Sequence, residues 1–194
     1  MGTHTRIVAL FLAPIGWALL LAATVTPSWR EFAQRPGYSA ALFFSDGLWE
    51  ACVEDTTLHS QECTSPPELM SLSWWPVLQR TLTLLSVTLG GLSYITAHLG
   101  VHWWDAHTSP GLTITSGVGI ALAGVIYICV VSYKAFEILL TLSNPSVDEG
   151  DKFRLGTALY LGWAGGTIEV LSGMMFTWSF GCCFGRDRLY GAQR

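Results

Sequence analysis

Charged side chains are scarce in this sequence of 194 residues: Asp, Glu, Lys and Arg together make up 12%, about half of their usual share in a soluble domain. Hydrophobic residues make up 51% and stand in long blocks that polar residues rarely interrupt. Such blocks argue against a soluble globular core, because a helix needs roughly 20 consecutive apolar residues to cross a bilayer. The sequence therefore predicts an integral membrane protein that is mainly α-helical.

Motifs for catalysis and for nucleic-acid binding are also missing. No phosphate-binding loop, nucleophile–base arrangement or carboxylate pair stands out, so we expect no enzymatic activity, no cofactor, no catalytic metal and no nucleic-acid partner. The single asparagine, Asn144, is followed by proline, which rules out an N-glycosylation sequon there.

Four apolar runs predict transmembrane helices, at about 7–25, 78–97, 112–131 and 157–180. A signal peptide is the alternative for the first run, although residues 24–27 make a poor cleavage site. Glycines inside the runs allow close approach of helix backbones. We therefore expect one domain over residues 1–194, a left-handed four-helix bundle. Loops at about 26–77 and 132–156 should lie on one side, and the loop 98–111 and tail 181–194 on the other.

The cysteines indicate which side is which, since the Lys and Arg distribution does not decide the orientation. Cys52 and Cys63 lie in a polar loop and predict a disulfide, which requires an oxidising, extracellular side. Zinc bound with the help of His59 is the weaker alternative. Both termini are then cytoplasmic. Cys182 and Cys183, beside the end of the last span, are candidates for palmitoylation, with inert interfacial thiols as the alternative.

The first long loop predicts β-structure, because helical periodicity disappears between residues 26 and 77. Residues 38–44 and 48–53 read as short strands around a turn at 45–47. A disulfide between the two loop cysteines would close the next hairpin and contribute about 3 kcal/mol by the loop-entropy estimate. The loop is rich in acids, which form either a solvated surface or part of a water-filled path that attracts cations.

Nearly the whole chain resembles the claudins, the four-span proteins that form the strands of tight junctions. The resemblance rests on Trp29, Gly47, Leu48, Trp49, Cys52, Cys63 and Arg80 in and beside the first loop, and on the stretch LGTALYLGWA at residues 155–164. The first-loop motif also occurs in the wider superfamily of peripheral-myelin-protein-like four-span proteins. The opening of the fourth span favours claudins proper.

The resemblance implies both a fold and a function. The fold is the four-helix bundle with a small extracellular antiparallel sheet, in which one strand comes from the second loop. The function is control of paracellular permeability and cell adhesion at tight junctions of the plasma membrane. The protein would polymerise with itself and with other claudins in cis and in trans, as a barrier or a cation-preferring pore. A non-junctional auxiliary or regulatory membrane subunit is the alternative. Charged residues near the cysteine hairpin set ion preference in the family. Asp55, three residues after Cys52, is at a position where cation-selective claudins can place an acid, which makes it the first candidate pore charge, with Glu54 as the second.

Two departures from the family pattern affect the expected partners. Leu142, Ser143, Asn144 and Pro145 form the candidate trans contact, but many claudins carry an aromatic pair before Asn-Pro, so adhesion should be weaker here. The sequence ends in Arg194, whereas many claudins end in a Tyr-Val-type ligand. A terminal Arg does not fill the apolar pocket of a PDZ domain, so we expect no PDZ scaffold binding through the C-terminus.

Four polar residues near or inside the spans have structural explanations. Glu169 is expected to be protonated and hydrogen-bonded to a Ser or Thr of a neighbouring helix, with a functional role as the alternative. Arg80 is expected to reach up from the second helix and tie down the sheet, in preference to acting as a pore charge. His98 and His102 are expected in an interfacial belt, in preference to a zinc site.

Overall fold

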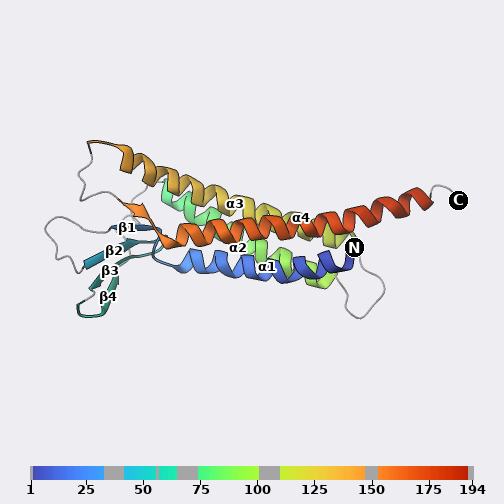
Figure 1. The fold of residues 1–194 in the computed structure, drawn as a ribbon, viewed down its shortest axis with the longest axis horizontal. Coiled ribbons are helices and arrows are strands. Elements are labelled where there is room, and N and C mark those ends of the chain that lie inside the picture. Colours follow the sequence, from blue (N-terminus) through green and yellow to red (C-terminus); the bar gives the residue numbers. More distant parts are fainter. Residues whose placement is uncertain are drawn as a thin grey trace.

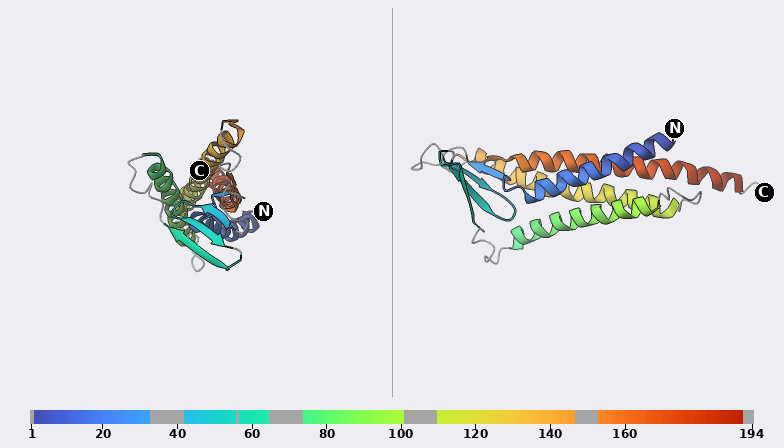
Figure 2. Two further views of the ribbon diagram at one scale, coloured as in Figure 1. Left: turned by 90° about the vertical axis from the view of Figure 1, so that its left-hand side faces the viewer. Right: turned by 90° about the horizontal axis from the view of Figure 1, so that it is seen from below.

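The computed structural model describes residues 2–32, 42–55, 57–64, 74–100, 110–146 and 153–191, without the side chains of residues 2–4, 6, 110 and 180–191. Within these ranges, four helices lie side by side in an elongated bundle, and a small sheet covers one end of it (Figures 1 and 2). The helices are α1 Gly2–Val25, α2 Trp74–Gly100, α3 Pro110–Ser143 and α4 Thr157–Gly191. Four helices with a small sheet confirm the predicted fold class. α1 begins and α4 ends at the end of the bundle away from the sheet (Figure 1).

The sheet joins strands from both predicted loops. Its strands are β1 Arg30–Phe32, β2 Leu42–Asp46, β3 Ala51–Asp55, β4 Ser60–Thr64 and β5 Arg154–Leu155, in the order β4-β3-β2-β1-β5. All neighbouring strands are antiparallel. β5 therefore attaches the second loop to the first, as the family resemblance implied.

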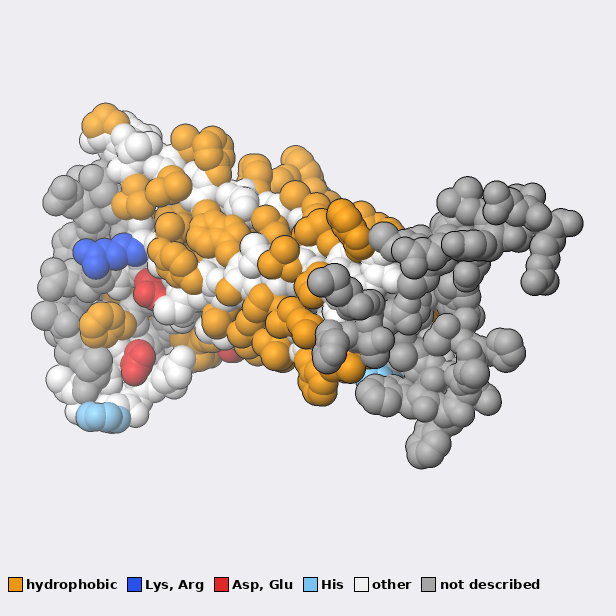
Figure 3. Space-filling view, turned by 45° about the vertical axis from the view of Figure 1, so that its right-hand side comes forward, with side chains coloured by type: hydrophobic (Ala, Val, Ile, Leu, Met, Phe, Trp, Pro, Cys, Tyr) orange, Lys and Arg blue, Asp and Glu red, His pale blue; other side chains and the backbone are white. Residues whose placement is uncertain are grey.

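Three of the helices are long and apolar enough to cross a membrane, at residues 7–25, 74–100 and 111–143 of the described chain. The fourth predicted span, 157–180, lies on α4, whose mean hydropathy is lowered by glycines, hydroxyl side chains and Glu169. α4 packs extensively against both α1 and α3, and its span remains a prediction. Hydrophobic side chains cover the middle of the bundle, and charged ones gather around the sheet (Figure 3).

Helix α3 continues past residue 131, where the apolar run ends. Lys134 and Glu137 form an ion pair of 2.7 Å with i,i+3 spacing, while Ala135 and Ile138 remain buried against the core. Hydropathy marks where a helix leaves the apolar environment, whereas packing and local pairing decide where it ends. Part of the predicted second loop is consequently helical.

The β2–β3 turn also differs from its prediction. β2 runs to Asp46, since Asp46 lies opposite Arg30 of β1 and the two side chains form an ion pair. The chain reverses at residues 47–50, with a hydrogen bond of 2.9 Å from the Gly47 amide to the Glu50 carbonyl. Residues 38–41 of the first predicted strand lie outside the described residues.

Glu169 is enclosed between helices and is only 1% exposed. Gly16 and Gly90 make room for it, because a Cβ atom at Gly16 would lie 2.9 Å from its Cγ and one at Gly90 would lie 3.0 Å from its Oε1. Its Oε2 has no hydrogen-bond partner among the described residues. The predicted bond from a neighbouring Ser or Thr is thus not found at that oxygen.

Candidate functional site

Two indoles connect the sheet to the end of α1. The Trp29 Nε1 donates to the Ala23 carbonyl at 2.9 Å, and the Trp49 Nε1 donates to the Thr24 carbonyl at 3.0 Å. Both carbonyls belong to the last turn of α1, where a helix leaves its C=O groups without intrahelical partners. Trp29 is 1% exposed, so the bond also satisfies an indole N–H that is shielded from water.

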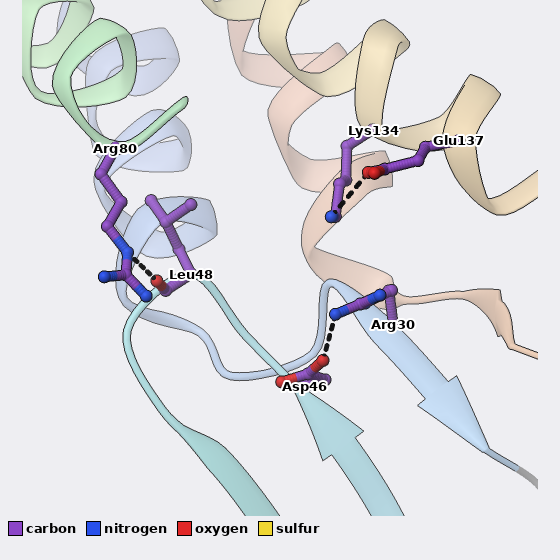
Figure 4. A network of polar contacts seen from close by, with 6 residues as sticks. All are labelled: Arg30, Asp46, Leu48, Arg80, Lys134 and Glu137. Atoms are coloured by element: carbon purple, nitrogen blue, oxygen red, sulfur yellow. Dashed lines mark hydrogen bonds and ion pairs between the residues drawn. The ribbon is translucent and has the colours of Figure 1, made fainter. Parts of the chain in front are cut away.

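Arg80 and Gly47 hold the turn between β2 and β3. The Arg80 Nε donates to the Leu48 carbonyl at 2.7 Å (Figure 4), and the guanidinium Cζ lies 5.7 Å from the centroid of the Trp49 ring. At Gly47 a Cβ atom would lie 2.6 Å from the Pro27 Cα, so only glycine fits. The structure thus brings together the five family-motif residues, and we call Trp29, Gly47, Leu48, Trp49 and Arg80 the sheet–bundle junction.

The start of α4 is tied to the same place. The Gly156 amide donates to the Trp29 carbonyl at 3.1 Å, and the Ala158 amide donates to the Ser28 carbonyl at 3.0 Å. A Cβ atom at Gly156 would overlap the Ser28 carbonyl oxygen. Sequence reasoning missed the role of Gly156, although its place in the LGTALYLGWA stretch was a signal.

The distal hairpin, β3 with β4, is closed by the predicted disulfide between Cys52 and Cys63. The two cysteines are directly opposite in the register and are bonded to each other, which confirms the pairing. All of β4 is exposed. The disulfide is therefore the main tertiary restraint on a strand that contributes nothing to the core.

Asp55 forms the turn of this hairpin. Its Oδ1 accepts hydrogen bonds from the Thr57 hydroxyl at 2.5 Å, the Thr57 amide at 2.8 Å and the Leu58 amide at 3.3 Å. The bonds from Thr57, its hydroxyl above all, hold the pKa of the Asp55 carboxyl below its ordinary value of 3.8. His59 completes the turn with a positive φ of 50°, a conformation that non-glycine residues rarely adopt.

The two candidate pore charges lie on opposite faces of the sheet. Paired residues of adjacent strands share a face, and successive residues alternate between faces. Glu54 is paired with Phe43 and Gln61, whereas Asp55 is paired with Leu42 and Ser60. The structure thus separates Glu54 from Asp55.

A shallow depression of about 310 Å³ lies over the Glu54 face. Residues that line it include Glu31, Phe43, Ser45, Glu54, Gln61 and Arg154, which all share this face by their register, and we call this set the acidic depression. Two carboxyl groups there outnumber one guanidinium. The Glu31 Oε1 also accepts a bond of 3.3 Å from the Thr157 amide, at the first turn of α4.

The candidate trans contact lies at the end of α3. Leu142 is half-buried and packs against the core, while Ser143, Asn144 and Pro145 are exposed. The Asn144 Oδ1 accepts bonds from the Ser146 amide at 3.1 Å and the Ser146 hydroxyl at 2.6 Å. This segment is therefore the end of α3 and the start of the turn that follows it, with Leu142 facing inward.

The other candidates lie partly outside the described residues. The backbone of Cys182 and Cys183 belongs to α4, but their side chains lie outside the described residues. Residues 192–194, on which the prediction about PDZ binding rests, and His102 also lie outside the described residues. The His98 Nε2 and the Tyr94 hydroxyl are hydrogen-bonded at 2.7 Å.

Apolar helices of spanning length, bundled under a disulfide-closed sheet, define a multi-pass membrane protein. Residues 3–176 match the sequence profile of the PMP-22/EMP/MP20/Claudin family, and the chain belongs to this family. It is 30% identical to claudin-8 of Mus musculus over 200 positions that cover 98% of this chain and 87% of the relative. It is 29% identical to claudin-3 of Rattus norvegicus, covering 94% and 83%, and 28% identical to claudin-15 of Bos taurus, covering 97% and 80%.

Proposed function

We propose that this protein is a tight-junction strand protein that controls paracellular permeability, with its sheet outside the cell and both termini in the cytoplasm. Similarity to several claudins over nearly the whole chain supports this proposal. Its partners would be further copies of itself and other claudins, in the same membrane and across the cell contact. The disulfide supports the orientation, because an oxidising compartment favours it.

We further propose that the paracellular path prefers cations, and that Glu54 is the main charge. The observation that carries this proposal is the shared face of Glu31 and Glu54 over the acidic depression. An exposed carboxylate attracts Na⁺ over a few ångströms even at physiological salt, where screening sets in at about 8 Å. Glu31 is engaged with α4, and Asp55 is bonded within its own turn on the opposite face, which leaves Glu54 in the better position.

The test is a NaCl dilution potential, measured with transepithelial resistance, across claudin-depleted epithelial cells that express this chain. We expect lower resistance and a potential that favours Na⁺. Glu54→Gln should reduce the ratio of Na⁺ to Cl⁻ permeability about twofold, the order of one exposed charge interaction, and Asp55→Asn is the matched control with little effect.

Raised resistance without charge preference would contradict the pore and leave a barrier. A larger loss from Asp55→Asn than from Glu54→Gln would contradict the choice of Glu54. An absence of any effect on resistance or potential, with the protein at cell contacts, would contradict a paracellular role.

A non-junctional auxiliary subunit remains the second candidate, and one observation favours it. Leu142, the apolar residue of the candidate trans contact, packs against the core instead of projecting outward. Freeze-fracture microscopy of transfected fibroblasts separates the two functions. Continuous intramembrane strands would support the junctional protein, and a plasma membrane that holds the protein without strands would support the auxiliary one.

A further inference from the structure

An apolar groove runs between α2 and α3 at the end of the bundle that carries the sheet. It has a volume of about 360 Å³ and lies within two helices of spanning length. Its lining is Trp75, Leu78, Gln79, Leu82, Val125, Ile126, Cys129, Val130 and Tyr133. Among the described residues no Lys or Arg belongs to this lining, so nothing in the groove would offset the negative charge of a phosphate or a carboxylate. We call it the α2–α3 groove.

Two residues that line the α2–α3 groove each carry a polar atom without a hydrogen-bond partner among the described residues. The Trp75 Nε1 and the Gln79 Nε2 are buried and unpaired in the part of the chain that the structure describes. Gln79 is only 7% exposed. With i,i+4 spacing, the two residues lie on one face of α2. Unpaired polar groups away from water are unfavourable, so an occupant that supplies a hydrogen-bonding atom would be favoured.

The chemistry of the pair selects a hydroxyl group. An indole N–H only donates, whereas the nitrogen and oxygen of a glutamine amide are exchanged by a simple flip. A hydroxyl accepts from Trp75 and can accept from or donate to Gln79, so it satisfies both residues in either amide orientation. An ester carbonyl accepts only and fits one orientation.

The shape of the α2–α3 groove selects a short, rigid apolar body. The polar pair lies nearer the sheet, at the start of α2, and Leu82 and Val125 lie deeper along the helices. Trp75 and Leu82 are separated by about 10 Å of helix, less than the roughly 15 Å of one leaflet of the hydrocarbon core that an acyl chain fills. We propose that the groove binds a membrane sterol, with the sterol hydroxyl at Trp75 and Gln79 and the fused rings against Leu82 and Val125. This site is independent of the proposed junctional function.

Cys129 offers a direct readout, because it lines the groove and is an exposed free thiol. The full chain, with Cys182→Ser and Cys183→Ser to leave Cys129 as the reactive thiol, is placed in phosphatidylcholine vesicles with or without cholesterol. The rate of alkylation by a membrane-permeant maleimide is measured. We expect cholesterol to slow the reaction severalfold, and epicholesterol, whose hydroxyl has the opposite configuration, to slow it much less.

Substitutions in the pair sharpen the test. Gln79→Leu removes the amide but keeps the bulk, and should weaken cholesterol protection roughly fivefold, the value of one hydrogen bond. Trp75→Phe keeps a ring without the donor and should have a similar effect. Thr88→Val is the matched control, since Thr88 is exposed on the same helix, outside the groove lining, and bonds only within α2.

Several results would overturn the proposal. Equal protection by both sterols would mean a change in bulk membrane order. Alkylation that is equally slow in phosphatidylcholine vesicles with and without cholesterol would identify an acyl chain as the occupant. Protection that grows with protein density would identify a second copy of the chain. Unchanged protection in a folded Gln79→Leu or Trp75→Phe protein would exclude the hydroxyl site.

Discussion

The two ends of the extracellular sheet are held by different means. At the sheet–bundle junction, the side chains of Trp29, Trp49 and Arg80 each donate to a backbone carbonyl at 3.0 Å or less. At the distal hairpin, β4 is exposed throughout and is held by the disulfide and by ladder bonds to β3. A small sheet without a core of its own is thus anchored by the bundle at one end and by a covalent bond at the other.

The largest effect is expected at the junction, from Gly156→Ala. The new Cβ atom would overlap the Ser28 carbonyl oxygen and approach the Trp29 backbone. Displacing this backbone would break the hydrogen bonds that Ser28 and Trp29 accept from the amides of Ala158 and Gly156. We expect a loss of about 3 kcal/mol or more in the free energy of unfolding, at the upper end of overpacking effects. Thermal unfolding in detergent and surface biotinylation would measure it.

Gly111→Ala serves as the control for this substitution. A Cβ atom at Gly111 meets no atom of the described residues within 4 Å, so the effect of Gly111→Ala on the free energy of unfolding should stay within about 0.5 kcal/mol. Wild-type stability in the Gly156→Ala protein would show that residues 28–29 can move away from the start of α4 without cost.

A smaller and more local effect is expected from Cys52→Ala combined with Cys63→Ala. The disulfide closes a loop with a sequence separation of 11, and its removal should destabilise the hairpin by about 2 to 3 kcal/mol. Hydrogen exchange with mass spectrometry should show faster exchange in β3 and β4 with unchanged protection in β1 and β5. Lost protection in all five strands would instead mean that the sheet unfolds as one unit and that its two ends are not independent.

The smallest effect concerns the Asp55 turn and its pH dependence. Because the pKa of Asp55 is lowered in the folded protein, the turn is stabilised above the ordinary pKa of the carboxyl and loses this stabilisation as the pH falls through the lowered value. An NMR titration of carbon-13-labelled aspartate in nanodiscs should give a midpoint for Asp55 below 3.8. Thr57→Ala should move the midpoint upward, and a midpoint that does not respond would show that the turn bonds do not set the titration.

The sequence predicts the anchored parts of the molecule better than the placement of individual charges. Long apolar runs and the paired cysteines indicate the bundle and the hairpin, because both follow from local composition. The continuation of α3 to Ser143 depends on the burial of Ala135 and Ile138, which hydropathy does not report. The family resemblance favoured Asp55 over Glu54 as the pore charge, and the predicted strand ended at residue 53, before either residue. β3 extends to Asp55, and only then does the alternation of a strand place the two carboxylates apart.

The unpaired donors of the α2–α3 groove were invisible in the sequence for a related reason. Trp75 stands at the end of the predicted first loop and Gln79 at the start of the predicted second span. Their burial arises from packing of α2 against α3, through contacts such as that of the Trp75 and Tyr133 rings, whose centroids are 4.3 Å apart. Pairings between distant helices are not encoded in the local pattern.

The two-residue strand β5 has a consequence for chimeric proteins. Arg154 and Leu155 pair with Glu31 and Arg30 of β1. The two loops are therefore joined by strand pairing and are not separable modules. A chimera that transplants only the first loop from a relative would match a foreign β1 to the resident β5. The natural unit of exchange is the first loop together with residues 153–158. Ion selectivity measured on single-loop grafts would combine the effect of the transplanted charges with that of a mismatched β1–β5 pairing.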